Sequence, residues 1–336
     1  MKRSYFAGAN TINGFVSYYE QIFGDIERIY VIKGGSGTGK SRLMKDVADA
    51  AENKGRCVEY FYCSFDPASL DGIIIDGSLA MIDGTSPHVF EPKLVGIKEN
   101  LIDLGAFWDE EKLRESGCEI RELLRAKKEH FKIAYSYLSA VGALDTVKKN
   151  IADKYITRDK ILTNAASLLS GSKPSQKGKE TVRLVSSFGM DGRVSFNTFE
   201  SVAQTTYKIR DSFGLGFLFL SALKNEAERF GISVVVSYDP LFENRPDALL
   251  LGDSIAVGLS PDGGDQSFSS FENALPENEK NELAELICQS KKLEFKAAEY
   301  LKKASKIHFN IENIFIPAMD FEKKEAFTRN FIKMHI

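Results

Sequence analysis

A glycine-rich segment at residues 33–41 constrains the fold of this chain more than any other feature. Its sequence is Lys-Gly-Gly-Ser-Gly-Thr-Gly-Lys-Ser, which fits the pattern G-x-x-x-x-G-K-[ST] from Gly34 to Ser41. A β-branched and aromatic run at residues 29–32 precedes it and predicts a buried strand. Apolar residues at helical spacing follow from Arg42 onward. A strand, this glycine loop and a helix form the context in which the pattern binds phosphate.

The residue types of the glycine loop explain how it would hold phosphate. Successive backbone N–H groups must point at the phosphate oxygens, and glycine adopts the required conformations without steric cost. The positive end of the following helix dipole adds to the same point. We expect Lys40 to contact the β and γ phosphates and Ser41 to ligate Mg²⁺. The predicted nucleotide-binding residues are Gly34, Gly35, Ser36, Gly37, Thr38, Gly39, Lys40, Ser41 and Arg42.

A carboxylate at the end of a neighbouring strand is expected to complete the metal site. Two short apolar runs each end in an aspartate, at Asp76 and at Asp83. Because such proteins place a metal-binding carboxylate at the end of a buried parallel strand, both residues qualify. Asp83 is preferred, since a polar loop that can lie beside a γ phosphate follows it at residues 84–88. His88 in that loop is a candidate for sensing phosphate or assisting water, although a lone histidine after proline is more often structural.

Composition and charge narrow the class of protein. The 336 residues are enough for two domains, and 43% hydrophobic with 27% charged residues is typical of a soluble globular protein. The formal net charge of -3 gives no global attraction to nucleic acid or to an anionic membrane. We find neither a signal-peptide pattern nor an apolar run of membrane-spanning length, which predicts a cytoplasmic protein. The four cysteines have no C-x-x-C spacing and are interpreted as reduced thiols, and the four histidines form no metal-ligand motif.

The second half of the chain repeats the first in order. Residues 30–55 correspond to 207–231, residues 71–81 to 247–257, and residues 127–134, within an amphipathic helix pattern, to 291–298. We therefore predict a tandem duplication of a three-layer α/β unit with a parallel sheet, each unit followed by a helical segment.

The same pattern predicts the domain boundaries. Residues 1–170 form the first domain, with a helical appendage from about residue 93 to residue 170. Residues 171–179 are a polar linker, rich in residues that favour turns. Residues 180–336 form the second domain and end in helices.

The second half has lost the residues that bind phosphate and metal. Phe217 and Leu218 replace the lysine and the serine of the glycine loop, and Leu259 falls at the position of the strand-end acid. Large apolar groups remove the charge compensation for phosphate and fill its space. One working site per chain is therefore predicted. Arginines of the second half that are candidates to complete it are Arg183, Arg193, Arg210 and Arg245, although ion-pair or surface roles are commoner for such residues.

Several segments together resemble a family of bacterial tandem P-loop ATPases of unestablished function. They are residues 5–11, 33–44, 69–75, 82–88 and, at the end of the chain, 314–321. The resemblance covers nearly the whole chain and implies ATP binding and a three-layer α/β fold, but it supplies no substrate. Members often keep a good glycine loop in both halves, and this chain departs from that pattern at Phe217 and Leu218.

The preferred functional hypothesis is a Mg²⁺-dependent ATPase with one site. A kinase-like phosphotransferase needs the same loop, with a small-molecule acceptor bound near residues 85–88. A scaffold that senses nucleotide without turnover is the third hypothesis. The absence of an N-K-x-D motif favours ATP over GTP. An unknown protein partner or a small-molecule acceptor is expected, whereas nucleic acid and membrane are not.

Overall fold

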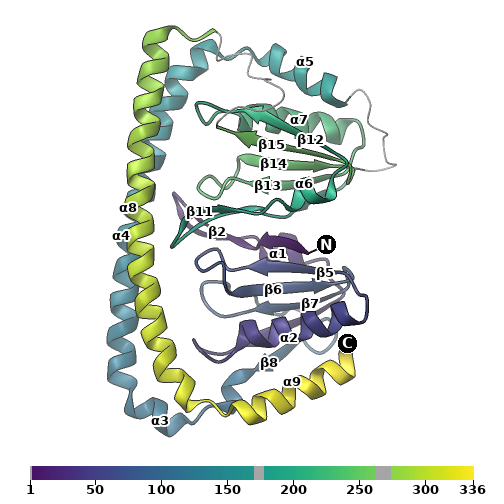
Figure 1. The fold of residues 1–336 in the computed structure, drawn as a ribbon, viewed down its shortest axis with the longest axis vertical. Helices are drawn as coiled ribbons and strands as arrows, with labels where there is room; N and C mark the ends of the chain where they lie inside the picture. Colours follow the sequence, from purple (N-terminus) through teal and green to yellow (C-terminus); the bar gives the residue numbers. More distant parts are fainter. Residues whose placement is uncertain (1, 170–177, 262–273) are drawn as a thin grey trace.

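Two α/β units lie one above the other along a pair of long helices (Figure 1). A computed structural model describes residues 2–169, 178–261 and 274–336 of the chain. Most of the predicted linker, residues 171–177, therefore lies outside the described residues. Within the described part, no helix combines the length and the apolar character needed to cross a membrane.

The first unit is built on a six-stranded sheet with the order β1-β5-β6-β7-β4-β8. Apolar side chains of β4 and its neighbours pack on one face against helix α2 and the C-terminal helix α9. On the opposite face a continuous apolar core joins this unit to the second one. The elements are β1 (Arg3–Phe6), the hairpin β2 (Gly8–Thr11) and β3 (Gly14–Ser17), α1 (Tyr19–Phe23), β4 (Arg28–Lys33), α2 (Lys40–Asn53), β5 (Val58–Tyr62), β6 (Leu70–Ile75), β7 (Leu79–Asp83) and β8 (Glu99–Asp103).

The second unit repeats this strand order. Its sheet has the order β9-β13-β14-β15-β12, with β12 in the place of β4, and the pairs have the same directions. Even the register repeats, since Ile32 pairs with Asp83 in the first unit and Ile209 pairs with Leu259 in the second. The elements are β9 (Glu180–Val182), β10 (Ser186–Gly189), β11 (Gly192–Ser195), α6 (Thr198–Val202), β12 (Thr205–Arg210), α7 (Phe217–Arg229), β13 (Val234–Tyr238), β14 (Pro246–Leu251) and β15 (Ile255–Ser260).

The sheets are mixed, which corrects the expectation of parallel sheets. Strand β6 runs antiparallel to both β5 and β7. The cause is a tight turn in which Asp76 and Gly77 have φ angles of 49° and 67°. Two successive positive φ angles reverse the chain into a hairpin, and Asp-Gly is a favoured sequence for such a turn. The second unit has the corresponding turn at Gly252 and Asp253, with φ angles of 54° and 56°.

The segment from residue 93 to residue 170 is not helical throughout, which corrects a second expectation. Strand β8 adds to the sheet edge in parallel with β4. Charged residues are tolerated at a sheet edge, so its sequence lacks the apolar run of a central strand. The elements that follow are η1 (Leu104–Phe107), α3 (Glu110–Glu115), α4 (Gly117–Ala152), η2 (Asp153–Tyr155) and α5 (Arg158–Leu169).

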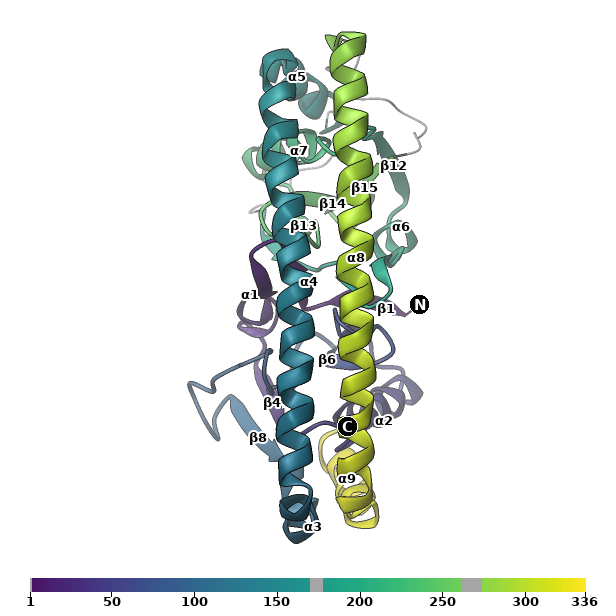
Figure 2. The same cartoon turned by 90° about the vertical axis from the view of Figure 1, so that its left-hand side faces the viewer.

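Each of the two long helices runs from one unit to the other. Helix α4 runs from the first unit to the second, where α5 packs on α7 (Figure 1). Helix α8 (Glu277–Phe315) returns beside it in the opposite direction, and through η4 (Ile316–Ala318) it leads to α9 (Phe321–His335), which packs on α2 (Figure 2). The buried side chains between the long helices are small or aliphatic, among them Ala134, Leu138, Ala297 and Leu301. Each long helix therefore ends on the unit that it does not follow in sequence.

Candidate phosphate-binding site

The glycine loop lies between the end of β4 and the start of α2. Gly37 and Gly39 have φ angles of 70° and 81°, in the left-handed region that glycine occupies without strain. Position 34 also requires glycine, because a β-carbon on Gly34 would lie 2.9 Å from Thr38 Oγ1. Gly39 is the N-cap of α2, so the first N–H groups of this helix lie at the loop.

Lys40 and Asp83 meet at the glycine loop. The Lys40 Nζ donates hydrogen bonds to the carbonyl oxygens of Gly34, at 3.0 Å, and Gly35, at 2.7 Å. It also lies 3.6 Å from Asp83 Oδ2. Asp83 is the last residue of β7, and its Oδ1 accepts hydrogen bonds from the N–H and hydroxyl of Thr85. The remaining carboxylate oxygen thus faces the lysine of the loop.

The residues present fit a Mg²⁺ ion. Ser41, in the first turn of α2, supplies a hydroxyl whose oxygen accepts a 3.0 Å hydrogen bond from the N–H of Leu70. Asp83 supplies a carboxylate that is 9% exposed. Mg²⁺ is held in such sites by one or two protein oxygens together with water and phosphate oxygens, so few protein ligands are needed.

Asp76 does not belong to this group, which corrects one of the two predicted acids. It lies in the turn between β6 and β7, at the end of the sheet opposite the glycine loop. Its carboxylate accepts hydrogen bonds from Arg56 Nε, at 2.6 Å, and from the N–H of Cys57, at 2.8 Å. The hydrogen bond from Arg56 lowers the pKa of Asp76. Its role is to close the turn.

Lys127 and His308 reach the glycine loop from the two long helices. Lys127 Nζ on α4 donates a hydrogen bond to His308 Nδ1 on α8 at 2.9 Å. The Nδ1 atom of His308 also lies 3.4 Å from Ser36 Oγ. Burial, with the nearby charges of Lys127 and Lys40, lowers the pKa of His308 to about 4. Burial also lowers the pKa of Lys127.

Glu312 contacts the glycine loop directly. Burial raises the pKa of its carboxylate, while the N–H of Gly37 acts in the opposite direction. The carboxylate lies 3.7 Å from His308 Nε2. The end of α8 is close enough that a β-carbon on Gly35 would lie 2.9 Å from a ring carbon of Phe315. The end of α8 therefore brings a carboxylate to the glycine loop, where a phosphate oxygen lies in loops of this kind.

Sequence reasoning missed these three residues of the long helices because they lie far from the loop along the chain. Lys127 and Glu312 look like ordinary charged residues on the solvated face of an amphipathic helix. Glu312 and His308 lie beside the loop because α8 returns to the first unit, where Lys127 of α4 contacts His308. Residues 127–134 and 291–298 repeat one another in the sequence, which indicates that the two long helices are related.

His88 faces an acid rather than the loop. Its Nε2 lies 3.1 Å from Asp71 Oδ2, and its ring stacks on Tyr19 at 5.5 Å between centroids. Phe15 contacts the ring edge-on at 4.9 Å. Burial raises the pKa of Asp71 to about 6. The structure thus gives His88 a buried partner that was not among the predicted site residues.

In the second unit, the chain's own carboxylate occupies the loop. Asp211 stands where the first unit has Gly34, and its Oδ1 accepts hydrogen bonds from the N–H groups of Leu215, at 2.7 Å, and Gly216, at 2.9 Å. The N-cap Gly216 has a φ of −59°, unlike Gly39. Phe217 lies under the guanidinium of Arg245, which is 4.6 Å from the ring centroid. Two N–H groups of this loop are therefore already bonded within the chain, and Phe217 stands in place of the loop lysine.

Three of the four candidate arginines form ion pairs with carboxylates outside the glycine loop. These pairs are Arg183 with Glu59, Arg193 with Asp239 and Glu294, and Arg245 with Asp145. The side chains that the long helices bring to the loop are instead those of Lys127 and His308.

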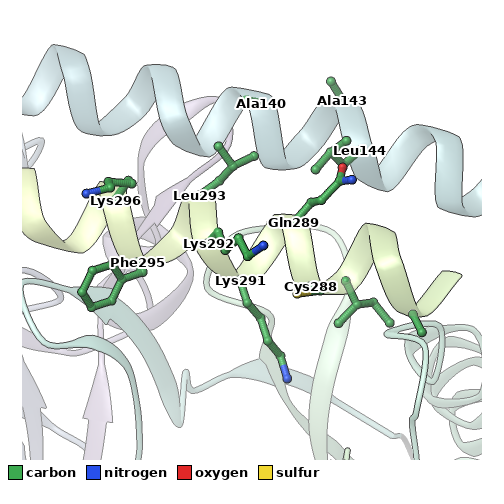
Figure 3. Close-up of a pocket in the computed structure, with 12 residues that line it drawn as sticks. Ala140, Ala143, Leu144, Cys288, Gln289, Lys291, Lys292, Leu293, Phe295 and Lys296 are labelled. Atoms are coloured by element: carbon green, nitrogen blue, oxygen red, sulfur yellow. The ribbon is translucent and has the colours of Figure 1, made fainter. Parts of the chain in front are cut away.

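An open groove lies between α4 and α8 (Figure 3). Its lining is mostly apolar, with Leu144 and Ala140 from α4 and Leu293 and Phe295 from α8. The charged groups that line it are all lysines, and the lining includes neither an acid nor a histidine. Chemistry that needs a base or a metal ligand is therefore better placed at the glycine loop.

Comparison of the chain with protein-family models, with curated proteins and with solved structures gave no match.

Proposed function

We propose that this chain binds Mg²⁺ and ATP at the glycine loop of the first unit and hydrolyses ATP there, as a member of the tandem P-loop ATPases that its motifs resemble. The observation that carries the proposal is the meeting of four groups on one loop. Lys40 and Asp83 come from the loop and the adjacent strand, and Lys127 and His308 come from the two long helices. The blocked second loop supports a single site.

Each residue has a role that follows from its position. The loop N–H groups and Lys40 would hold the phosphate oxygens, with Lys40 exchanging its carbonyl contacts for phosphate. Ser41 and Asp83 would hold Mg²⁺, which when bound supplies neutralisation of the charge between the β and γ phosphates. Lys127 places a further positive charge near Ser36, through its contact with His308. Closure by the ends of the long helices would exclude water from the loop.

The direct test measures binding and turnover in the full chain. We expect calorimetry to give one ATP per chain in the presence of Mg²⁺, and phosphate release to stop when EDTA removes the metal. GTP in place of ATP tests the base preference. Binding without turnover would contradict hydrolysis and favour the sensing scaffold, and no binding would contradict the proposal as a whole.

Glu312→Gln is expected to tighten ATP binding about 5-fold, or about 1 kcal/mol. The native carboxylate lies at the glycine loop, where it would repel the charge of a bound phosphate, whereas the amide carries no charge. Titration of ATP into both proteins measures the change. The matched control is Glu299→Gln on the same helix, where the side chain is 42% exposed and pairs with Lys296. Unchanged or weaker binding by the Glu312 variant would show that the carboxylate does not oppose ATP binding.

ATP binding is expected to take up a proton at His308. Its pKa of about 4 keeps the free side chain neutral near pH 7, while Lys127, Lys40 and Glu312 are the charged groups around it. A bound triphosphate favours the charged imidazole, so the pKa rises on binding and affinity rises as the pH falls. Calorimetry in two buffers between pH 7.5 and about 6 measures the proton uptake. His308→Gln should remove the part of the proton uptake that His308 contributes. Identical uptake by both proteins would contradict the assignment.

A further inference from the structure

Cys63, Asp71 and His88 form a cluster that the nucleotide site does not use. Cys63 follows β5, Asp71 belongs to β6, and His88 lies in the loop after β7. One ligand atom of each lies within 4.8 Å of the other two. Asp71 is 4% exposed and His88 is 6% exposed. Three different metal-binding side chains thus meet in the interior of the first unit.

The contact between Asp71 and His88 has the spacing of two metal ligands and not the alignment of a hydrogen bond. The Nε2 and Oδ2 atoms are 3.1 Å apart, yet Oδ2 has no hydrogen-bond partner among the described residues. A buried carboxylate oxygen without a partner is costly. Two ligands of one tetrahedral zinc ion lie about 3.3 Å apart, with their lone pairs aimed at the metal and not at each other. A cation between them would account for both the spacing and the orphaned oxygen.

The surroundings hold the cluster in place. Tyr19 stacks on the imidazole with an interplanar angle of 13°, and Phe15 contacts it edge-on. The Cys63 sulfur lies within 4.8 Å of a carboxylate oxygen of Asp71. Cys63 forms no disulfide, so its sulfur is free to act as a ligand. Rotation of these side chains is restricted, which favours a preorganised site.

We propose that Cys63, Asp71 and His88 bind one Zn²⁺ ion, with the fourth position left to water. Sulfur and imidazole ligands together with a single carboxylate suit Zn²⁺ and not Mg²⁺ or Ca²⁺, which require oxygen ligands. The ion would join the end of β5, the start of β6 and the loop after β7. This zinc site is separate from Ser41 and Asp83, although Leu70, next to Asp71, donates its N–H to Ser41.

The test uses the full chain without nucleotide, so its outcome is independent of ATP binding. Metal-free protein is titrated with Zn²⁺ by calorimetry and with Co²⁺ in an absorption spectrometer. We expect one ion per chain, a thiolate-to-cobalt charge-transfer band, and an increase in Tm on adding Zn²⁺. The variants Cys63→Ser and Asp71→Asn keep the side-chain volume, and circular dichroism verifies that they fold.

The variants decide between zinc binding here and zinc binding elsewhere. Cys63→Ser should lose the charge-transfer band and weaken Zn²⁺ binding at least about 100-fold, because a thiolate ligand is removed. Asp71→Asn should weaken binding while the band remains. Cys288→Ser, at an exposed cysteine on α8, is the matched control and should bind as the native chain does. Failure of the native chain to bind Zn²⁺, or equal binding by Cys63→Ser, would overturn the proposal.

Discussion

The Lys40→Ala variant is expected to bind Mg²⁺ and ATP at least about 100-fold more weakly than the native chain, and to release no phosphate. The native Nζ already lies at the glycine loop, between the carbonyl oxygens of Gly34 and Gly35 and the carboxylate of Asp83. Hydrogen bonds to charged groups contribute about 1.5–3 kcal/mol each. The variant loses the hydrogen bonds that Lys40 would donate to the phosphates, and the loss of two such bonds accounts for a change of this size. Titration of ATP and a phosphate-release assay measure it.

The control for this variant is a lysine at the other end of the same helix. Lys54 is the exposed C-cap residue of α2, and Lys54→Ala should bind ATP as the native chain does. A thermal melt of Lys40→Ala verifies that the fold is intact. Equal ATP binding by Lys40→Ala and the native chain would place the nucleotide outside the glycine loop and contradict the proposed function.

The second unit offers a converse test of the same argument. Restoring the lysine with Phe217→Lys is not expected to create a second ATP site. The N–H groups of its loop are already bonded to Asp211, which would repel phosphate. Calorimetry should therefore still give one ATP per chain. A second ATP bound by Phe217→Lys would show that the lysine alone decides which loop binds.

The part of the site that could be predicted from sequence is the part that is contiguous in sequence. The glycine loop has a fixed spacing because its backbone must wrap one phosphate, so its residues follow each other along the chain. Asp83 was predictable because a strand next to the loop strand ends beside it. Asp76 was misplaced because the expectation of parallel strands ignored the Asp-Gly turn that reverses the chain.

The rest of the site depends on long-range packing. Lys127 and His308 are 181 residues apart and meet only because α8 returns beside α4. Cys63, Asp71 and His88 have no spacing typical of a metal motif, since they come from one strand and two loops that the sheet brings to the same end. The repeat predicted two related units, and their strand orders agree. It did not predict that each long helix ends on the opposite unit.

Asp145→Ala is expected to destabilise the chain by about 3–5 kcal/mol, the cost of removing one partner from a buried ion pair. Asp145 on α4 is 5% exposed and accepts a 2.9 Å hydrogen bond from Arg245 of the second unit. Lys148 lies 2.9 Å away and also donates to the carbonyl of Gly214. The variant would remove the carboxylate partner of two partly buried cations where α4 meets the second unit. Urea denaturation followed by circular dichroism measures the loss, with the exposed Glu129→Ala on the same helix as control.

The pH dependence of this loss identifies its cause. Burial alone would raise the pKa of Asp145, but the hydrogen bond from Arg245 and the charge of Lys148 outweigh it and lower the pKa. A carboxylate with a lowered folded-state pKa stabilises the fold above its unfolded pKa of about 3.9, and the contribution disappears as the pH falls through the folded value. The native chain and Asp145→Ala should therefore differ most near pH 7 and converge in acid. A difference in stability that does not change with pH would mean that α4 is held by packing and not by the charge of Asp145.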